Sequence, residues 1–229
     1  MDRVKVIPVL IDGKIGYDIE VTDPGATVQE YIDAVNNFID TAKYCRIRNP
    51  ETDSCFGCDL CCQERIPVTL IDVLNMSEGK FRQFVCEMLH VYVEGRVVDI
   101  TMSLDELERC RYLDNSLGIC SNYRKRPLVC QTFICCPATR NANKLREEII
   151  NAGEDELVRK WFKFRDKNNN PIIHEGILPA PDIRDYCPTP FAGAVSYDQV
   201  KLIDLCNSRL WHKLTEKKRV FREIVEKKS

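Results

Sequence analysis

Residues 55–62 read CFGCDLCC, so four cysteines, Cys55, Cys58, Cys61 and Cys62, fall within eight positions. A thiolate is a soft, strong metal ligand, and the Cys-x-x-Cys spacing lets two sulfurs from one tight turn reach the same metal. A second group follows at Cys110, Cys120, Cys130, Cys135 and Cys136. Nine of the 13 cysteines therefore lie in two short groups, and we predict a protein built around a metal or iron–sulfur centre.

The composition is that of an ordinary globular protein. Of the 229 residues, 44% are hydrophobic and 30% are charged, and the formal net charge of -2 gives no indication of nucleic-acid binding. No apolar run approaches the ~20 residues that span a bilayer, and the N-terminal residues lack the apolar region of a signal peptide. We therefore expect no membrane span and a cytoplasmic location, where clustered cysteines bind metal more often than they form disulfides.

The first residues predict a hairpin followed by a helix. Residues 3–10 and 15–21 alternate like strands on either side of Asp12-Gly13, which is a hairpin signal. Thr27 and Glu30 form a capping-box pattern that opens a helix over about 28–44.

The remaining elements are predicted from the same kinds of local signal. Thr69 with Asp72 starts a short helix, Ser77 caps a second one, and Ser196 with Gln199 caps a last helical stretch. Arg126-Pro127 opens a helix with Cys130 one turn into it, where the helix dipole favours a thiolate. Arg124, Lys125 and Arg126 would offset the negative charge of a thiolate centre, but the ordinary interpretation, which we favour for Arg124 and Lys125, is that they are surface charges. The other predicted ranges are helices at 78–91, 142–151, 154–165 (split from the former by Gly153) and 197–226, and a strand at 97–103.

These elements predict an α+β fold that is mostly helical, with a cysteine-rich, metal-centred core, an N-terminal hairpin and C-terminal helices. We divide the chain into three parts. They are an N-terminal hairpin and helix (1–46), a cysteine-cluster metal-binding domain (47–140) and a helical C-terminal extension packed on the core (141–229).

The spacing of the first cysteine group suits two kinds of metal centre. Three cysteines at two-residue gaps resemble the first three ligands of a ferredoxin 4Fe–4S cluster, but the usual fourth cysteine three residues later is absent. The same thiols with two distant cysteines would also make a closed zinc site. The clustered cysteines are too many for one four-sulfur site, so we expect two centres, or one centre with spare thiols. Candidates for the missing ligand are Cys110, Cys120, Cys130, and the two cysteines that precede proline, Cys136 and Cys187.

A known family shares this pattern. The string Cys55-x2-Cys58-x2-Cys61-Cys62, then Cys110-x-Tyr112-Leu113-Asp114, then Cys120-Ser121-x-Tyr123-x-x-Arg126-Pro127-x-x-Cys130, resembles the CxxCxxCC zinc- or iron-chelating family of YkgJ-like proteins over about residues 50–140. The family often has Ile before the tyrosine and Arg after the last cysteine, where this chain has Asn122 and Gln131. The resemblance implies that these cysteines are the metal ligands: Cys55, Cys58, Cys61, Cys62, Cys110, Cys120 and Cys130.

Three functional hypotheses follow, and the spacing does not separate them. The first is a 4Fe–4S protein that acts in electron transfer or as a redox enzyme, with a redox protein as partner. The second is a zinc-binding structural or interaction module. The third is a cluster-dependent methyl-transfer enzyme, implied only by the resemblance to flagellin lysine methylase. No signature of a zinc protease, a serine hydrolase or a nicotinamide dehydrogenase occurs in the sequence.

Other cysteines and the C-terminal residues receive ordinary interpretations. Cys45, Cys86 and Cys206 stand alone in helical patterns, and we interpret them as small buried hydrophobes. The roles of Cys135, Cys136 and Cys187 stay open. The basic residues 208–229 carry an apolar stripe at helical spacing, which favours an amphipathic surface helix.

Overall fold

The computed structural model describes residues 2–42, 46–48 and 58–218. Within these residues more residues are in helices than in strands, and the fold is mixed α+β, as predicted. The chain forms two compact units, each made from separate stretches of sequence. Unit 1 comprises Met1–Ser54, Gln131–Ile149 and Ser196–Ser229, and unit 2 comprises Cys55–Cys130 and Ile150–Val195. The predicted division into 1–46, 47–140 and 141–229 stays a prediction.

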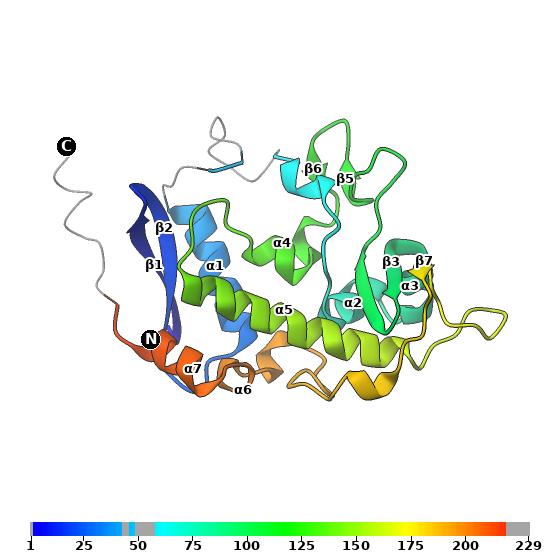
Figure 1. Ribbon diagram of the computed structural model, residues 1–229. Coiled ribbons are helices and arrows are strands. Elements are labelled where there is room, and N and C mark those ends of the chain that lie inside the picture. The colour runs from blue at the N-terminus through cyan, green and yellow to red at the C-terminus, as the bar shows by residue number, and fades with distance from the viewer. Residues whose placement is uncertain (1, 43–45, 49–57, 219–229) are drawn as a thin grey trace. The chain divides into compact units, whose positions relative to one another are not determined.

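Unit 1 begins with the predicted hairpin and helix. Strands β1 (Val4–Ile11) and β2 (Lys14–Val21) pair antiparallel, and the turn residues Asp12 and Gly13 both have positive φ, which the hairpin turn requires. Helix α1 (Val28–Thr41) starts at a complete capping box and packs on the hairpin (Figure 1). Both predictions are confirmed, because hairpin turns and capping boxes are signals written in adjacent residues.

The end of unit 1 differs from the predicted helix at 197–226. The described part instead holds a 3-10 turn η4 (Tyr197–Gln199), a single turn α6 (Leu202–Leu205) and helix α7 (Ser208–Thr215), which Asn207 caps. The backbone around Val200 pairs with the residues that precede α1: Val28 N donates to Val200 O at 2.9 Å, and Leu202 N donates to Ala26 O at 2.9 Å. These tertiary hydrogen bonds replace the helical ones, so the single helix was a wrong prediction. Residues 219–226 lie outside the described chain.

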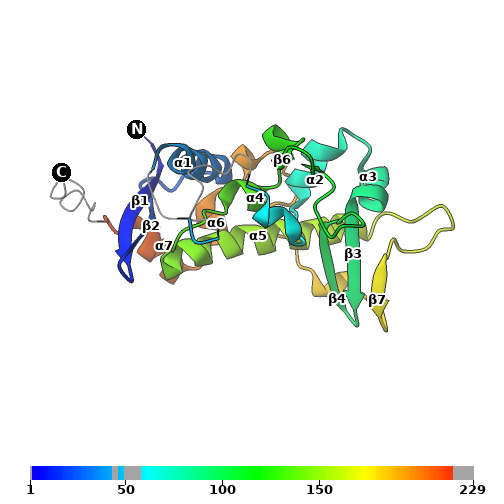
Figure 2. The same ribbon diagram turned by 90° about the horizontal axis from the view of Figure 1, so that it is seen from above.

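Unit 2 contains a three-stranded sheet with the order β4-β3-β7, which Figure 2 shows side by side. Strand β3 (Leu89–Glu94) pairs antiparallel with β4 (Val97–Met102) and parallel with β7 (Glu175–Ile177). Helices α2 (Leu70–Ser77) and α3 (Phe81–Met88) precede the sheet, and buried side chains of these elements form one hydrophobic core. Strand β4 confirms the strand predicted at 97–103.

The predicted helix at 78–91 is only partly present. Ser77 is the last residue of α2 and does not cap α3, because Glu78 and Gly79 both have positive φ and end the helix. The residues after Met88 form β3, in which burial alternates with period two and ends exposed at Glu94. Here the strand period overrides the helical pattern.

A single long helix replaces the two helices predicted on either side of Gly153. Helix α5 (Arg140–Trp161) runs through this glycine. A Cβ at Gly153 would lie 2.5 Å from Thr69 Cγ2, so the glycine is there for a close approach and not for a break. Trp161 at the end of α5 is buried and donates through Nε1 to Ile172 O at 2.8 Å.

The cysteine region of unit 2 consists of short elements. They are η1 (Leu60–Gln63), β5 (Leu113–Asp114), β6 (Ile119–Cys120), η2 (Tyr123–Lys125) and α4 (Leu128–Thr132), and a further 3-10 turn, η3 (Ile183–Asp185), lies in the loop after β7. Across residues 2–42, 46–48 and 58–218, no helix has the length and apolar content that crossing a membrane requires.

Candidate metal centre

The site is assembled from three separate segments of unit 2. Turn η1 carries Cys61 and Cys62, the β5–β6 hairpin follows Cys110 and contains Cys120, and α4 carries Cys130. The amide of Cys110 donates to Cys62 O at 2.7 Å, and the amide of Leu113 donates to Cys110 O at 2.8 Å. Backbone hydrogen bonds therefore bring η1 and the hairpin together.

Helix α4 is tied to α2 through one carboxylate. Asp72 is 3% exposed, and its Oδ2 accepts from Thr69 N at 2.9 Å and from Thr69 Oγ1 at 3.0 Å, which completes the capping box of α2. Its Oδ1 accepts from Leu128 N at 2.8 Å, at the first residue of α4. Asp72 thus satisfies a buried donor at the start of the helix that carries Cys130.

The thiols are close enough to influence one another's ionisation. Burial, followed by the neighbouring Cys110, Cys120 and Cys61, raises the pKa of Cys62 to about 12. The pKa of Cys130 is also raised by burial and then by Cys110, Asp72, Cys62 and Cys120. Burial is the main cause for Cys110 and Cys120 as well. Five thiols therefore form one electrostatically coupled group, which we call the thiol cluster: Cys61, Cys62, Cys110, Cys120 and Cys130.

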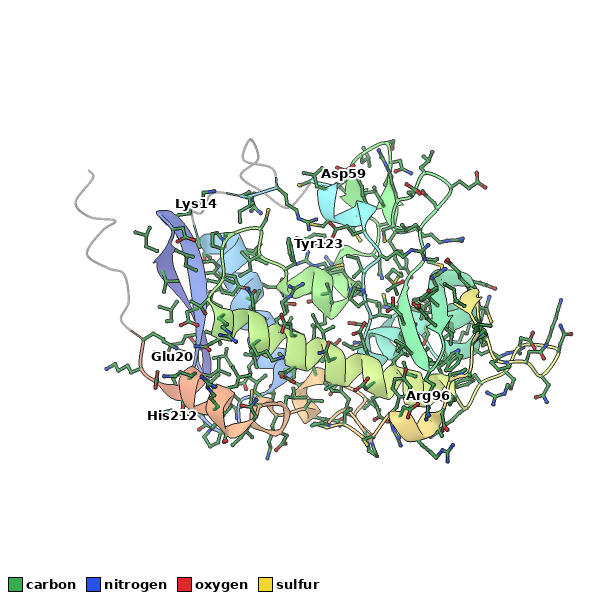
Figure 3. The ribbon with its side chains drawn as sticks, in the orientation of Figure 1. Lys14, Glu20, Asp59, Arg96, Tyr123 and His212 are labelled. Atoms are coloured by element: carbon green, nitrogen blue, oxygen red, sulfur yellow. The ribbon has the colours of Figure 1, made fainter. Side chains whose placement is uncertain are left out.

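The surroundings of the thiol cluster are mixed. Cys130 and Tyr112 pack against the hydrophobic core of unit 2, which explains the burial. Arg126 lowers the pKa of Cys120, and its guanidinium carbon lies 4.0 Å from the centroid of the Tyr123 ring (Figure 3). Asp59, which is also labelled in Figure 3, directly precedes η1, and its Oδ2 lies 3.8 Å from Arg109 Nη1. The predicted charge compensation therefore comes from Arg126.

The structure bears on two predictions about this region. Helix α4 is only five residues long, and the pKa of Cys130 is raised by burial and by its neighbours, not lowered. Arg124 is exposed, and Lys125 is half exposed and bonds through Nζ to Glu78 Oε1 at 2.6 Å. Both are surface charges, as the ordinary interpretation expected.

The other predicted cysteines lie elsewhere or are not described. Cys55 and Cys45 fall outside the described residues. Cys58 is half-buried just before η1. Cys136 belongs to unit 1, where burial raises its pKa to about 12 and Cys135 raises it further. Cys86 is exposed, so its interpretation as a buried hydrophobe is wrong, while Cys206 is half-buried.

The thiols of the thiol cluster are suitable metal ligands, but they are not already arranged around one ion. All five donors are sulfur, the ligand that zinc and iron–sulfur clusters take. The described residues include no set of three or more His, Cys, Asp or Glu side chains already arranged around one ion. Sequence reasoning missed Asp72 as a support of Cys130. Its capping box was visible, but the contact with Leu128, 56 residues later, left no local signal.

Comparison with known proteins bears on part of the chain. Residues 54–150 match the model of the CxxCxxCC family, described as "Putative zinc- or iron-chelating domain". The match confirms the resemblance predicted from the cysteine spacing, and it covers less than half of the chain. No curated protein and no solved structure matches the chain.

Proposed function

From the match of residues 54–150 to a zinc- or iron-chelating domain, we propose that the protein holds a 4Fe–4S cluster and acts in electron transfer or as a redox enzyme. Cys62, Cys110, Cys120 and Cys130 are the proposed ligands best supported by the structure. Cys55, Cys58, Cys61 and Cys136 remain candidates for the same cluster or a second centre. The observation that carries the proposal is the electrostatic coupling of thiols from three chain segments.

The thiols in this region outnumber the four cysteines that one structural zinc or one 4Fe–4S cluster takes, which supports a second centre or spare thiols. A single zinc ion takes four ligands, whereas five coupled thiols and Cys58 are present in this region. The raised pKa values mean that the free thiols hold their protons, and a bound metal would supply the positive charge that stabilises the thiolates. Such a cluster would supply a one-electron carrier whose potential depends on burial and on hydrogen bonds to sulfur.

The residues around the thiol cluster would tune that carrier. The apolar side of Cys130 would limit access of water, and Arg126 would offset part of the negative charge near Cys120. Arg126 would stabilise an anionic centre and the apolar burial would disfavour added negative charge, so the two effects act in opposite directions, and neither provides a ligand. A redox protein is the proposed partner.

Metal and sulfide analysis of the full-length protein, purified without oxygen, tests the proposal. We expect iron and acid-labile sulfide in equal amounts and a broad visible absorption that dithionite bleaches. Cys130→Ser should lose most of this absorption, whereas Cys86→Ser, which changes an exposed thiol outside the thiol cluster, should keep it. A colourless protein with stoichiometric zinc would replace the proposal with the zinc module, and a protein with neither metal would overturn both.

A further inference from the structure

A pocket of about 270 Å³ lies in unit 1, and its described lining residues include Cys136 but none of the five thiols of the thiol cluster. Residues 133–138 form one wall of the pocket. The rest of its lining consists of Tyr17, Ile47, Arg48, Asn143 and Arg146. The described lining residues include two arginines and no aspartate or glutamate. The size is at the lower end of the range for small-molecule sites.

The wall of this pocket is held firmly by the backbone. Tyr17 N donates to Pro137 O at 2.9 Å, and Thr139 N donates to Tyr17 O at 2.9 Å, so the segment before α5 lies alongside β2 (Figure 1). A Cβ at Gly16 would lie 2.3 Å from Pro137 O, so only glycine permits this approach. On the opposite side Arg48 N donates to Cys135 Sγ at 3.1 Å. The pocket is therefore formed before any ligand arrives.

Two guanidinium groups meet at one aromatic ring in the pocket. The guanidinium carbons of Arg48 and Arg146 lie 5.0 and 5.2 Å from the centroid of the Phe133 ring. Within the described chain Arg146 forms no ion pair, and its Nε is buried without a hydrogen-bond partner. A buried donor without a partner is costly, and a half-buried cation without a counter-ion is unusual.

A second buried polar atom lies near Arg146. The hydroxyl of Tyr31 is buried without a hydrogen-bond partner, and the residue is 0% exposed. Burial raises the pKa of Tyr31, and the charge of Arg146 acts against that rise, so the two groups are close. Tyr17 is affected in the same way: its pKa is raised to about 12, with burial as the main cause, and the charge of Arg146 acts against that rise. Arg146 thus places a positive charge among neutral hydroxyls and thiols.

We propose that this pocket binds a small organic anion whose carboxylate or phosphate group pairs with Arg146 and Arg48. Guanidinium groups hold both oxyanions through paired hydrogen bonds. Ile47, Ile134 and Pro137 would contact an apolar body on the same ligand. The Cys135 thiol lines the pocket and would lie beside the bound anion.

Calorimetric titration of the full-length protein with benzoate and with inorganic phosphate, at fixed ionic strength, tests the proposal. Arg146→Gln should weaken binding by about tenfold or more, because a charge-assisted hydrogen bond is lost. Arg146→Lys should weaken it less. Arg140→Gln removes the same charge from an exposed position on α5 and should leave binding unchanged. The probe that binds more tightly identifies the head group.

A second measurement does not depend on the heat of binding. The bound probe should slow alkylation of Cys135, located by mass spectrometry, and should leave alkylation of Cys86 unchanged. If Arg146→Gln does not fold by circular dichroism, the exposed Arg48→Gln replaces it. The proposal is overturned if neither probe binds, or if binding survives in a folded arginine variant. None of these variants removes a thiol, so metal content should be the same in all of them, and a loss of probe binding at unchanged metal content is distinguishable from a failure of the metal centre.

Discussion

The backbone amide of Cys110 donates a 2.7 Å hydrogen bond to the carbonyl oxygen of Cys62. This bond connects the two cysteine groups of the sequence without using either thiol. Both side chains therefore stay available as ligands while the main chain fixes the segments that carry them. The Cys110 thiol raises the proton affinity of Cys62, and a bound cation would counteract this effect.

The first prediction concerns these two thiols. Cys62→Ser and Cys110→Ser should each lower metal affinity by about a hundredfold, since each removes one of the several ligands that share the binding free energy. Competition with a chromophoric chelator measures this loss. Cys206→Ser, at a half-buried thiol of unit 1, is the matched control and should bind metal like the unchanged protein. An equal loss in all three variants would contradict the assignment.

The second prediction concerns Asp72, which serves the capping box of α2 and the first turn of α4. Asp72→Ala should destabilise the protein by about 2–4 kcal/mol, because two buried backbone donors lose their acceptor, and should also reduce metal uptake through Cys130. Chemical unfolding and metal analysis measure the two effects. Glu30→Ala disrupts the other capping box, at α1 in unit 1, and should lower stability alone. Normal metal uptake by Asp72→Ala would show that the Leu128 contact does not position Cys130.

The third prediction concerns Glu154 on α5. Burial, with smaller contributions from the nearby Asp99 and Asp155, raises the pKa of this carboxyl from 4.5 to about 8. Because the folded pKa exceeds the unfolded one, the stability from this group is fully present below pH 4.5 and is lost as pH rises through about 8. Glu154→Gln should therefore raise the free energy of unfolding at pH 8.5 by on the order of a few kcal/mol and change it little at pH 4. Urea unfolding at the two pH values measures this, and an equal effect at both would contradict it.

The fourth prediction concerns Gly153, where a side chain would meet Thr69. Alanine favours a helix over glycine by about 1 kcal/mol, yet Gly153→Ala should destabilise the protein by about 1–3 kcal/mol through overpacking. Asn151→Ala, at an exposed position of the same helix, should be neutral or stabilising. Thermal unfolding of both variants measures these changes in stability. Stabilisation by Gly153→Ala would contradict the prediction and show that α5 and α2 separate easily.

The sequence predicted the elements whose signals are local. Each of these signals lies within four or five consecutive residues, and each element appears as expected: the Asp12-Gly13 turn and the capping boxes at Thr27 and Thr69. Gly153 and Ser77 were misread because the decisive facts are a tertiary approach and two residues of positive φ. A glycine in a helical pattern reads as a break unless the neighbouring element is known.

The candidate site was predictable in composition but not in arrangement. Cysteine spacing pointed to the family, because this spacing is contained in the sequence itself. The coupling of Cys62 with Cys120 and Cys130 arises from hydrogen bonds between distant segments, such as that from Leu128 to Asp72. The exposure of Cys86 and the uncompensated charge of Arg146 were invisible for the same reason.

The parallel pairing of β3 with β7 sets an order of events during synthesis. Strand β7 comes from residues 175–177, well after Cys130, so the sheet of unit 2 closes only when that later stretch has left the ribosome. All the cysteines of the thiol cluster are made before then. The nascent chain therefore carries all five thiols of the thiol cluster while the sheet of unit 2 is still open.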